Sequence, residues 1–171
     1  MYQRIVSGVK LKGGLSAKLF NKTAALGTKE YEQGLDKLNF LEKIQNRLLS
    51  KLVRDKVAGR FGGRLKAFIS GGAPLNYDIG IFFHSLGVRL AQGYGMTETA
   101  PIVSCNPLDL NRIKIDTVGP PVPRVEVKLA SDNELLVRGE LTMNGYWNST
   151  KLTNEVLKDG WIHTGDIAEI D

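Results

Sequence analysis

Residues 65–95 read LKAFISGGAPLNYDIGIFFHSLGVRLAQGYG, and this stretch decides the fold class. Leu65–Ile69 is a short apolar run that suits a buried strand, and Val88–Ala91 is a second one. Between them, Leu75–Leu86 has the apolar spacing of a helix, with Asn76 as its N-cap. Strand, loop, helix and strand in this order indicate an α/β segment. Four apolar side chains should form the inner face of this helix: Ile79, Phe82, Phe83 and Leu86.

Both loops of this segment follow the carboxyl ends of predicted strands, where ligands bind in open parallel sheets. In Ser70–Leu75 (SGGAPL), two glycines let a backbone approach a ligand, and a proline that enters a helix leaves amide groups free for anions. An ordinary strand-to-helix turn would have the same composition. In Gln92–Thr99 (QGYGMTET), a ring between glycines can lie against a planar ligand, Thr97 offers a hydroxyl donor, and Glu98 suits Mg²⁺. The alternative is a polar loop that caps a helix.

Upstream of this segment, residues 1–60 should be helical and basic. Seven apolar residues recur at three- and four-residue steps: Leu35, Leu38, Leu41, Ile44, Leu48, Leu52 and Val53. We interpret them as one apolar stripe with a charged back. An earlier helix, Arg4–Leu26, should be broken by Gly13-Gly14 and by Gly27, and Gly59 with Gly62-Gly63 should end the second helix.

Downstream, residues 117–171 should form a small, mainly antiparallel sheet. Val125–Leu129 and Glu134–Arg138 should pair as a hairpin whose turn contains Asn133, a residue that tolerates a left-handed backbone. Two further strands, Trp161–Thr164 and Ile167–Ile170, should flank a turn at Gly165-Asp166. A carboxylate there can accept hydrogen bonds from a ribose diol, as in dinucleotide sites, or it can form an Asx-turn. We therefore divide the chain into a helical basic segment (1–60), an α/β nucleotide-binding segment (61–116) and a β-rich subdomain (117–171), all parts of one incomplete domain.

Composition narrows the class of protein. The chain has 171 residues, 42% of them hydrophobic and 24% charged, which is typical of a globular domain. No apolar run is long enough to span a bilayer, and the N-terminus lacks a signal-peptide pattern. One cysteine, Cys105, excludes an internal disulfide framework, and with two histidines a structural zinc site is not expected. These features predict a cytoplasmic protein, with peripheral contact at the inner membrane face as an option.

Charge is distributed unevenly along the chain. Residues 1–66 contain fifteen Lys and Arg against five Asp and Glu, whereas the remainder is net acidic. Such a segment can meet a phosphate-rich partner or simply present a solvated face. Base-reading motifs and aromatic-interleaved basic patches are missing from the sequence, so no nucleic-acid partner is expected. A basic segment that binds a membrane surface, without catalysis, stays open as an alternative.

Four other residues carry weaker signals. Tyr146, in Gly-Tyr-Trp, should pack or line an apolar channel. His163 should be satisfied by a hydrogen bond rather than act in catalysis, and no partner for acid–base chemistry can be named for His84. Cys105 is expected in the core.

From Gly62 to Asp171 the sequence resembles adenylate-forming enzymes of the acyl-CoA synthetase superfamily, and most closely the bacterial long-chain fatty acid–CoA ligases. Six motifs carry this resemblance: GRLKAFISGGAPL from Gly63, QGYGMTET from Gln92, VGPPVP from Val118, VRG from Val137, MNGYW from Met143 and GWIHTGD from Gly160. The similarity over residues 1–60 is looser. The resemblance implies part of the large N-terminal domain of such a synthetase.

The resemblance also implies an activity and a set of site residues. A fatty carboxylate would react with Mg-ATP to give an acyl-adenylate, and coenzyme A would then take the acyl group. Tyr94 would stack on adenine, Asp166 would bind the ribose hydroxyls, Thr97 would contact the α-phosphate, and Glu98 would hold Mg²⁺; Thr97 and Glu98 are the catalytic candidates. The remaining cofactor-binding candidates would shape the pocket: Gly71, Gly72, Ala73, Gln92, Gly93, Gly95 and Met96.

Two residues depart from the family pattern. Glu140 stands where proline is usual, and Arg124 stands where glycine is common. The family's phosphate loop should lie before residue 1, and its ribose-binding arginine and mobile C-terminal domain should lie beyond residue 171. We therefore expect an internal fragment that does not catalyse by itself. The alternative substrates are aryl or amino acid carboxylates, and the sequence sets neither acyl chain length nor oligomeric state.

Overall fold

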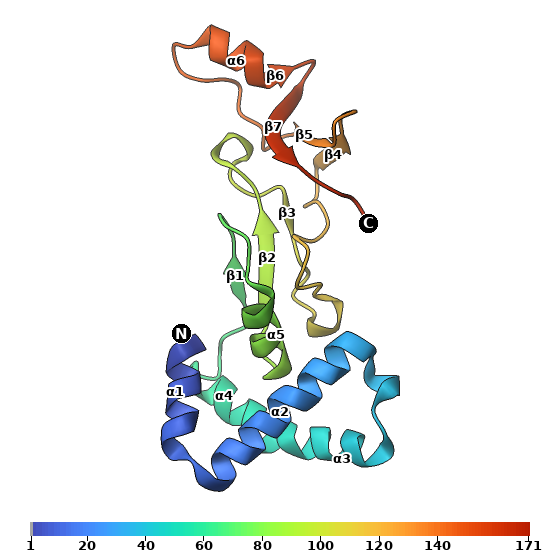
Figure 1. Cartoon of the computed structure of the whole chain (residues 1–171). Helices are drawn as coiled ribbons and strands as arrows, with labels where there is room; N and C mark the ends of the chain where they lie inside the picture. The colour runs from blue at the N-terminus through green and yellow to red at the C-terminus, as the bar shows by residue number, and fades with distance from the viewer. Residues whose placement is uncertain (1) are drawn as a thin grey trace. The chain divides into compact units, whose positions relative to one another are not determined.

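The computed structural model describes residues 2–171, and Figure 1 labels their helices and strands. The chain forms two compact units whose segments alternate along the sequence. Unit 1 comprises residues 2–70, Pro74–Ala91 and Pro107–Asp116. Unit 2 comprises Gly71–Ala73, Gln92–Asn106 and Thr117–Asp171. Each unit therefore depends on contacts between residues that are distant in sequence.

Unit 1 contains most of the helices. They are α1 (Tyr2–Lys12), α2 (Gly14–Gln33), η1 (Leu35–Lys37), α3 (Phe40–Leu49), η2 (Ser50–Arg54), α4 (Asp55–Arg60), α5 (Tyr77–Ser85) and η4 (Leu110–Arg112). Side-chain capping fixes the N-terminal ends of two of these helices, α3 and α5. Asn39 and Glu42 form a reciprocal capping box at α3, and the Asn76 side chain accepts the backbone N–H of Ile79 at 3.1 Å, which confirms the predicted N-cap of α5.

The predicted helix break at Gly27 is wrong, although the break at Gly13-Gly14 is confirmed. Helix α2 continues from Gly14 to Gln33, and Gly27 is buried in it. A Cβ atom at Gly27 would lie 2.5 Å from the backbone oxygen of Ser85 in α5. This glycine therefore serves the close packing of two helices rather than ending one of them.

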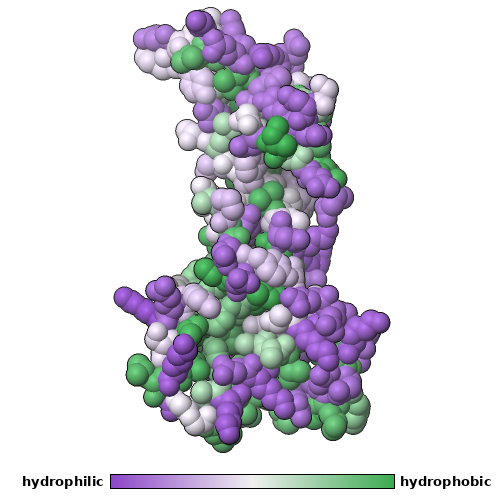
Figure 2. Space-filling model, in the orientation of Figure 1, coloured by the Kyte–Doolittle hydropathy of each residue, from purple (hydrophilic) through white to green (hydrophobic). Residues whose placement is uncertain are grey.

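The apolar stripe predicted over residues 35–53 does not form one buried face, because most of its members are exposed. Leu38 and Val53 are buried, but Leu41 is 67% exposed and Leu48 is 57% exposed. The chain has separate elements in this region, including a π-type turn at Ser50–Arg54, so one helical period does not run through it. Figure 2 accordingly shows apolar residues at the surface among the charged residues of this part of the chain.

Two sheets account for the strands. Strands β1 (Phe68–Ser70), β2 (Leu90–Tyr94) and β3 (Ser104–Cys105) form a mixed three-stranded sheet in the order β1-β2-β3. Unit 2 holds an antiparallel sheet of order β4-β5-β7-β6, with β4 (Val125–Leu129), β5 (Glu134–Gly139), β6 (Leu157–Lys158) and β7 (Trp161–Ile167). The predicted hairpin of β4 and β5 is confirmed, with Asn133 at φ 66°.

Two local predictions differ from the structure in unit 2, and one helix there was not predicted. Residues 92–94 extend β2 rather than starting a loop. Gly165 and Asp166 lie within the continuous strand β7 rather than in a turn between two strands. Helix α6 (Thr150–Val156) was not predicted. Strand pairing continues β2 and β7 through glycine-containing sequence, which local composition alone reads as loop.

Each unit has its own core. In unit 1, Phe83 of α5 and Leu86, which caps that helix, pack with residues of α2, α3 and α4, whereas Ile81 packs with Ile113 and Ile115. Unit 2 is centred on Val103, Leu135 and Val137. Within residues 2–171, every helix is too short or too polar to cross a bilayer.

The two departures from the family pattern meet each other in unit 2. Arg124 has φ 67°, a conformation that favours glycine, and its Nη1 lies 3.0 Å from Glu140 Oε2. Both side chains are largely exposed, so this ion pair adds little stability.

Candidate functional site

The candidate nucleotide-binding residues come from three motifs: the glycine loop SGGAPL, the QGYGMTET run and the GWIHTGD run. All of these residues belong to unit 2: Gly71–Ala73, residues 92–98 and Asp166. Tyr94 ends β2, and its hydroxyl donates a hydrogen bond to Asp166 Oδ2 at 2.5 Å. Burial, with the hydrogen bond to Asp166, raises the pKa of Tyr94 to about 12, so the phenol stays protonated at neutral pH. The structure thus brings together an aromatic ring and a carboxylate that are 72 residues apart.

A β-bulge presents the Asp166 carboxylate. Glu134 pairs with Ile167 and Leu136 pairs with His163, so β7 has extra residues opposite β5. Gly165 adopts φ 74° within this irregularity, and its N–H donates to Glu134 Oε1 at 2.9 Å. The Gly165 N–H and the His163 ring hold the pKa of Glu134 below its usual value. His163 Nδ1 lies 2.7 Å from Glu134 Oε2, so the predicted hydrogen-bonded role of His163 is confirmed.

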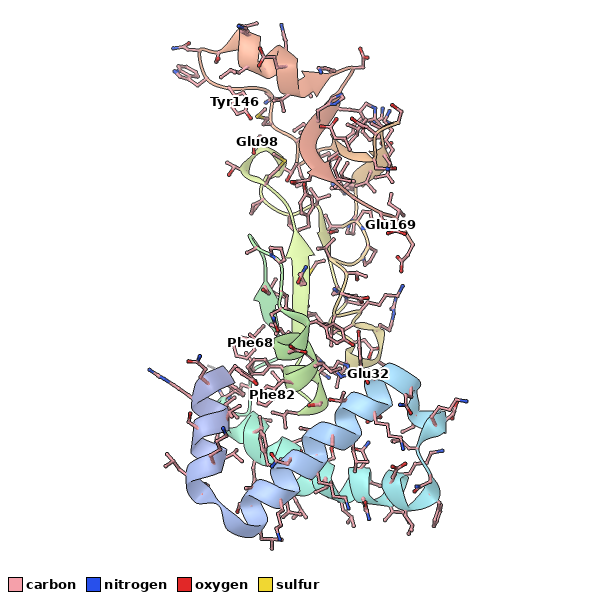
Figure 3. The ribbon with its side chains drawn as sticks, viewed as in Figure 1. Glu32, Phe68, Phe82, Glu98, Tyr146 and Glu169 are labelled. Carbon is pink, nitrogen blue, oxygen red and sulfur yellow. The ribbon has the colours of Figure 1, made fainter. Side chains whose placement is uncertain are left out.

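Glu98 lies in a short 3₁₀ turn, η3 (Thr97–Thr99). The buried Thr99 hydroxyl accepts the Met96 N–H at 3.1 Å and donates to the Met96 carbonyl at 3.0 Å, which holds the turn together. The Glu98 carboxylate accepts a hydrogen bond from the Tyr146 hydroxyl at 2.6 Å. Figure 3 labels both residues. That carboxylate raises the pKa of Tyr146. This hydrogen bond involves one of the two oxygens of the Glu98 carboxylate.

Tyr146 is the partner that sequence reasoning missed, because packing or an apolar channel was expected for it. Two contacts anchor the loop that carries it. The Met143 N–H donates to the Glu98 carbonyl at 2.8 Å, and the Tyr146 N–H donates to Thr153 Oγ1 at 2.9 Å. Gly145 has φ 144°, and a Cβ atom there would lie 2.8 Å from Thr153. The Gly-Tyr pair was the one available signal, but its partner is 48 residues away.

Close backbone packing explains the two glycines that flank Tyr94. A Cβ atom at Gly95 would lie 1.8 Å from the Pro101 oxygen, and one at Gly93 would lie 3.0 Å from the Ser104 oxygen. A Cβ atom at Gly71 would lie 3.5 Å from the Gly93 oxygen, so the first glycine loop and β2 are neighbours. In contrast, Gly72 has φ 77° and open space at its Cβ position.

The chemistry of these donors fits a magnesium nucleotide. Among residues 2–171, no three His, Cys, Asp or Glu side chains are grouped so that they could hold a metal. Mg²⁺ in nucleotide sites uses one or two carboxylates together with phosphate oxygens, and Glu98 supplies such a carboxylate. Thr97 is exposed, whereas Gln92 and Met96 are partly buried.

The surroundings of His84 and Cys105 do not activate either side chain for catalysis. His84 Nε2 lies 2.9 Å from the Leu110 carbonyl, and burial lowers the pKa of His84. Cys105 is partly buried, and burial raises the pKa of its thiol, which disfavours the reactive thiolate form.

Comparisons with known proteins agree with these motifs. The family model described as AMP-binding enzyme matches residues 19–147. The long-chain-fatty-acid–CoA ligase FadD15 of Mycobacterium bovis is 39% identical over 131 residues, which cover 77% of this chain and 22% of that protein. The peroxisomal long chain acyl-CoA synthetase 6 of Arabidopsis thaliana is 36% identical over 183 residues, covering 98% of this chain and 25% of that protein.

Solved structures show the same similarity. The amide bond synthetase McbA from Marinactinospora thermotolerans has a TM-score of 0.56 and 32% identity, covering 63% of this chain and 24% of that chain. Apo MatB from Rhodopseudomonas palustris has a TM-score of 0.59 and 27% identity, covering 77% of this chain and 27% of that chain. The chain thus spans about a quarter of the length of the proteins it matches. Because the family model covers more than half of it, the chain belongs to the AMP-binding enzyme family.

Proposed function

We propose that this chain is the nucleotide-binding part of a long-chain fatty acid–CoA ligase. Such an enzyme adenylates a fatty carboxylate with Mg-ATP and transfers the acyl group to coenzyme A. The names of the similar curated proteins support this substrate class. The observation that carries the proposal is the hydrogen bond from Tyr94 to Asp166, because it joins the two motifs expected to meet adenine and ribose.

Four residues have distinct roles in the proposed site. The Tyr94 ring stacks on adenine, and the exposed Asp166 carboxylate accepts the ribose hydroxyls in exchange for the Tyr94 hydroxyl. The Thr97 hydroxyl donates to the α-phosphate. Glu98 holds Mg²⁺ through the oxygen that Tyr146 leaves available.

The remaining candidates shape the pocket around these groups. The loop at Gly71, Gly72 and Ala73 borders Gly93, because a Cβ atom added at Gly71 would be in van der Waals contact with the Gly93 oxygen. Gln92, Gly95 and Met96 complete the same pocket. Open space at Gly72 leaves its backbone accessible to a ligand.

The proposed reaction makes a stable carboxylate reactive in two steps. A carboxylate oxygen forms a bond to the α-phosphorus of ATP, and the bond to the bridging oxygen breaks to release pyrophosphate. The thiol sulfur of coenzyme A then bonds to the acyl carbon and its proton passes to solvent, while the bond from the acyl carbon to the AMP oxygen breaks and AMP leaves with the electron pair. Mg²⁺ supplies charge stabilisation on the phosphate oxygens. In this scheme Thr97 and Glu98 bind and orient the phosphates.

Titration of the chain with Mg-ATP by calorimetry tests the nucleotide site. Asp166→Asn removes a charged acceptor, and we expect about a tenfold to hundredfold weaker binding, since hydrogen bonds to charged groups contribute about 1.5–3 kcal/mol. Asp159→Asn is the matched control, because Asp159 is exposed and has φ 51°, which asparagine tolerates. Equal affinities for the two variants would contradict the proposal.

We also propose that this chain alone does not catalyse the first step, the adenylation of the fatty carboxylate. Incubation with palmitate, ATP and Mg²⁺ should release no pyrophosphate above background, because the phosphate loop of the family is not among its 171 residues. Palmitate-dependent pyrophosphate release that Glu98→Gln abolishes would contradict this part.

A further inference from the structure

A groove of about 350 Å³ opens among α1, α2, η2 and α4. All of its lining residues belong to unit 1, and none belongs to the nucleotide motifs. Its apolar lining includes Ile5, Val9, Leu19, Phe20, Val53 and Val57. The nucleotide site proposed above therefore leaves this groove unexplained.

Cations border the groove from two helices. Arg4 and Lys12 are eight residues apart on α1, and Lys56 and Arg60 are four residues apart on α4, so each pair lies on one helix face. No Asp or Glu lines the groove, and residues 2–29 contain neither. Within residues 2–171, none of the four cations is in an ion pair. The groove therefore combines an apolar lining with an uncompensated positive border.

The space over Gly8 shows how the groove is kept open. Gly8 lies between Arg4 and Lys12 in α1 and lines the groove, yet a Cβ atom there would meet nothing within 4 Å. The volume is near the lower end of small-molecule sites, which hold about 300–1,000 Å³. It is suited to one alkyl chain rather than to the two chains of a phospholipid.

We propose that this groove binds one free long-chain carboxylate at a site separate from the nucleotide motifs. The alkyl chain lies on the apolar lining, and the carboxylate pairs with the cations at the border. Charge complementarity and the single-chain volume select this occupant over a neutral lipid or a bilayer. The site depends on unit 1 alone, so it stands or falls independently of the proposed nucleotide site.

Filling the groove tests the apolar part. Gly8→Leu places a side chain in the open space and favours the helix, because leucine has a higher helix propensity than glycine. Gly59→Leu is the matched control: Gly59 lies in α4, does not line the groove, and also has open space at its Cβ position. In a titration with monomeric palmitate and no nucleotide, we expect at least tenfold weaker binding for Gly8→Leu and no change for Gly59→Leu. Circular dichroism verifies that both variants fold.

Neutralising the border tests the charged part. We expect the double variant Arg4→Gln, Arg60→Gln to bind palmitate several-fold more weakly, with a smaller dependence on salt. Lys18→Gln, Lys22→Gln is the control, because these lysines lie on α2 outside the groove. Methyl palmitate should bind the unmodified chain more weakly than palmitate.

Three results would overturn the proposal. The first is the absence of palmitate binding, and the second is equal palmitate binding by Gly8→Leu and Gly59→Leu. The third is binding of the chain to phosphatidylglycerol vesicles that neither the Gly8→Leu substitution nor added palmitate reduces. The last result would assign the positive surface to a bilayer instead.

Discussion

At the scale of a single residue, the raised pKa of Tyr94 reports on the candidate nucleotide site. This pKa is raised to about 12, first by burial and then by the bond to Asp166, so the folded chain retains a proton that the unfolded chain loses near pH 10. Stability from this group is therefore complete below pH 10 and declines as the pH rises towards 12. Stability falls at high pH because burial disfavours the charged phenolate form of Tyr94.

Spectrophotometric titration at 295 nm checks this prediction. The step near pH 12 should disappear in Tyr94→Phe, whereas the contributions of Tyr77 and Tyr146, whose pKa values are also raised, should remain. In Asp166→Asn the Tyr94 step should move to lower pH but stay above the ordinary value, because burial persists. A Tyr94 step near pH 10 in the unmodified chain would contradict the burial and the hydrogen bond together.

At the scale of elements, the contact of α2 with α5 depends on Gly27. Gly27→Ala would place a Cβ atom 2.5 Å from the Ser85 oxygen, which is backbone and cannot rotate away. We expect the free energy of unfolding to fall by about 1–3 kcal/mol, as for other overpacked sites. Urea denaturation measures it, with Gly8→Ala as the control. That helical glycine faces open space, so alanine there should raise stability by up to about 1 kcal/mol.

Arg124, directly before β4, has a strained backbone conformation. Arg124 at φ 67° costs about 1–2 kcal/mol relative to glycine, whereas its exposed ion pair with Glu140 contributes at most about 1 kcal/mol. Arg124→Gly should therefore raise the midpoint of thermal unfolding, and Glu140→Gln alone should change it little. A lower midpoint for Arg124→Gly would show that the ion pair outweighs the backbone strain.

At the scale of the whole molecule, two separate cores predict two unfolding transitions. Helices α1–α5 belong to unit 1, and both tryptophans, Trp147 and Trp161, belong to unit 2. Gly27→Ala should shift the transition seen by circular dichroism at 222 nm more than the one seen by tryptophan fluorescence. Val137→Ala, in the core of unit 2, should do the reverse, with a cost of about 1–3 kcal/mol. Identical shifts for both probes in both variants would indicate one cooperative unit.

Features whose physical cause is local could be predicted from the amino-acid sequence. Asn76 caps α5 and Asn133 takes a left-handed turn because each acts within a few residues of its own position. The three motifs could likewise be recognised, since each is a short contiguous run. The tertiary structure alone decided which face of residues 40–52 is buried, why Gly27 must be small, and that Tyr146 meets Glu98. Those outcomes depend on partners tens of residues away, and spacing along the chain carries no information about which distant surface comes into contact.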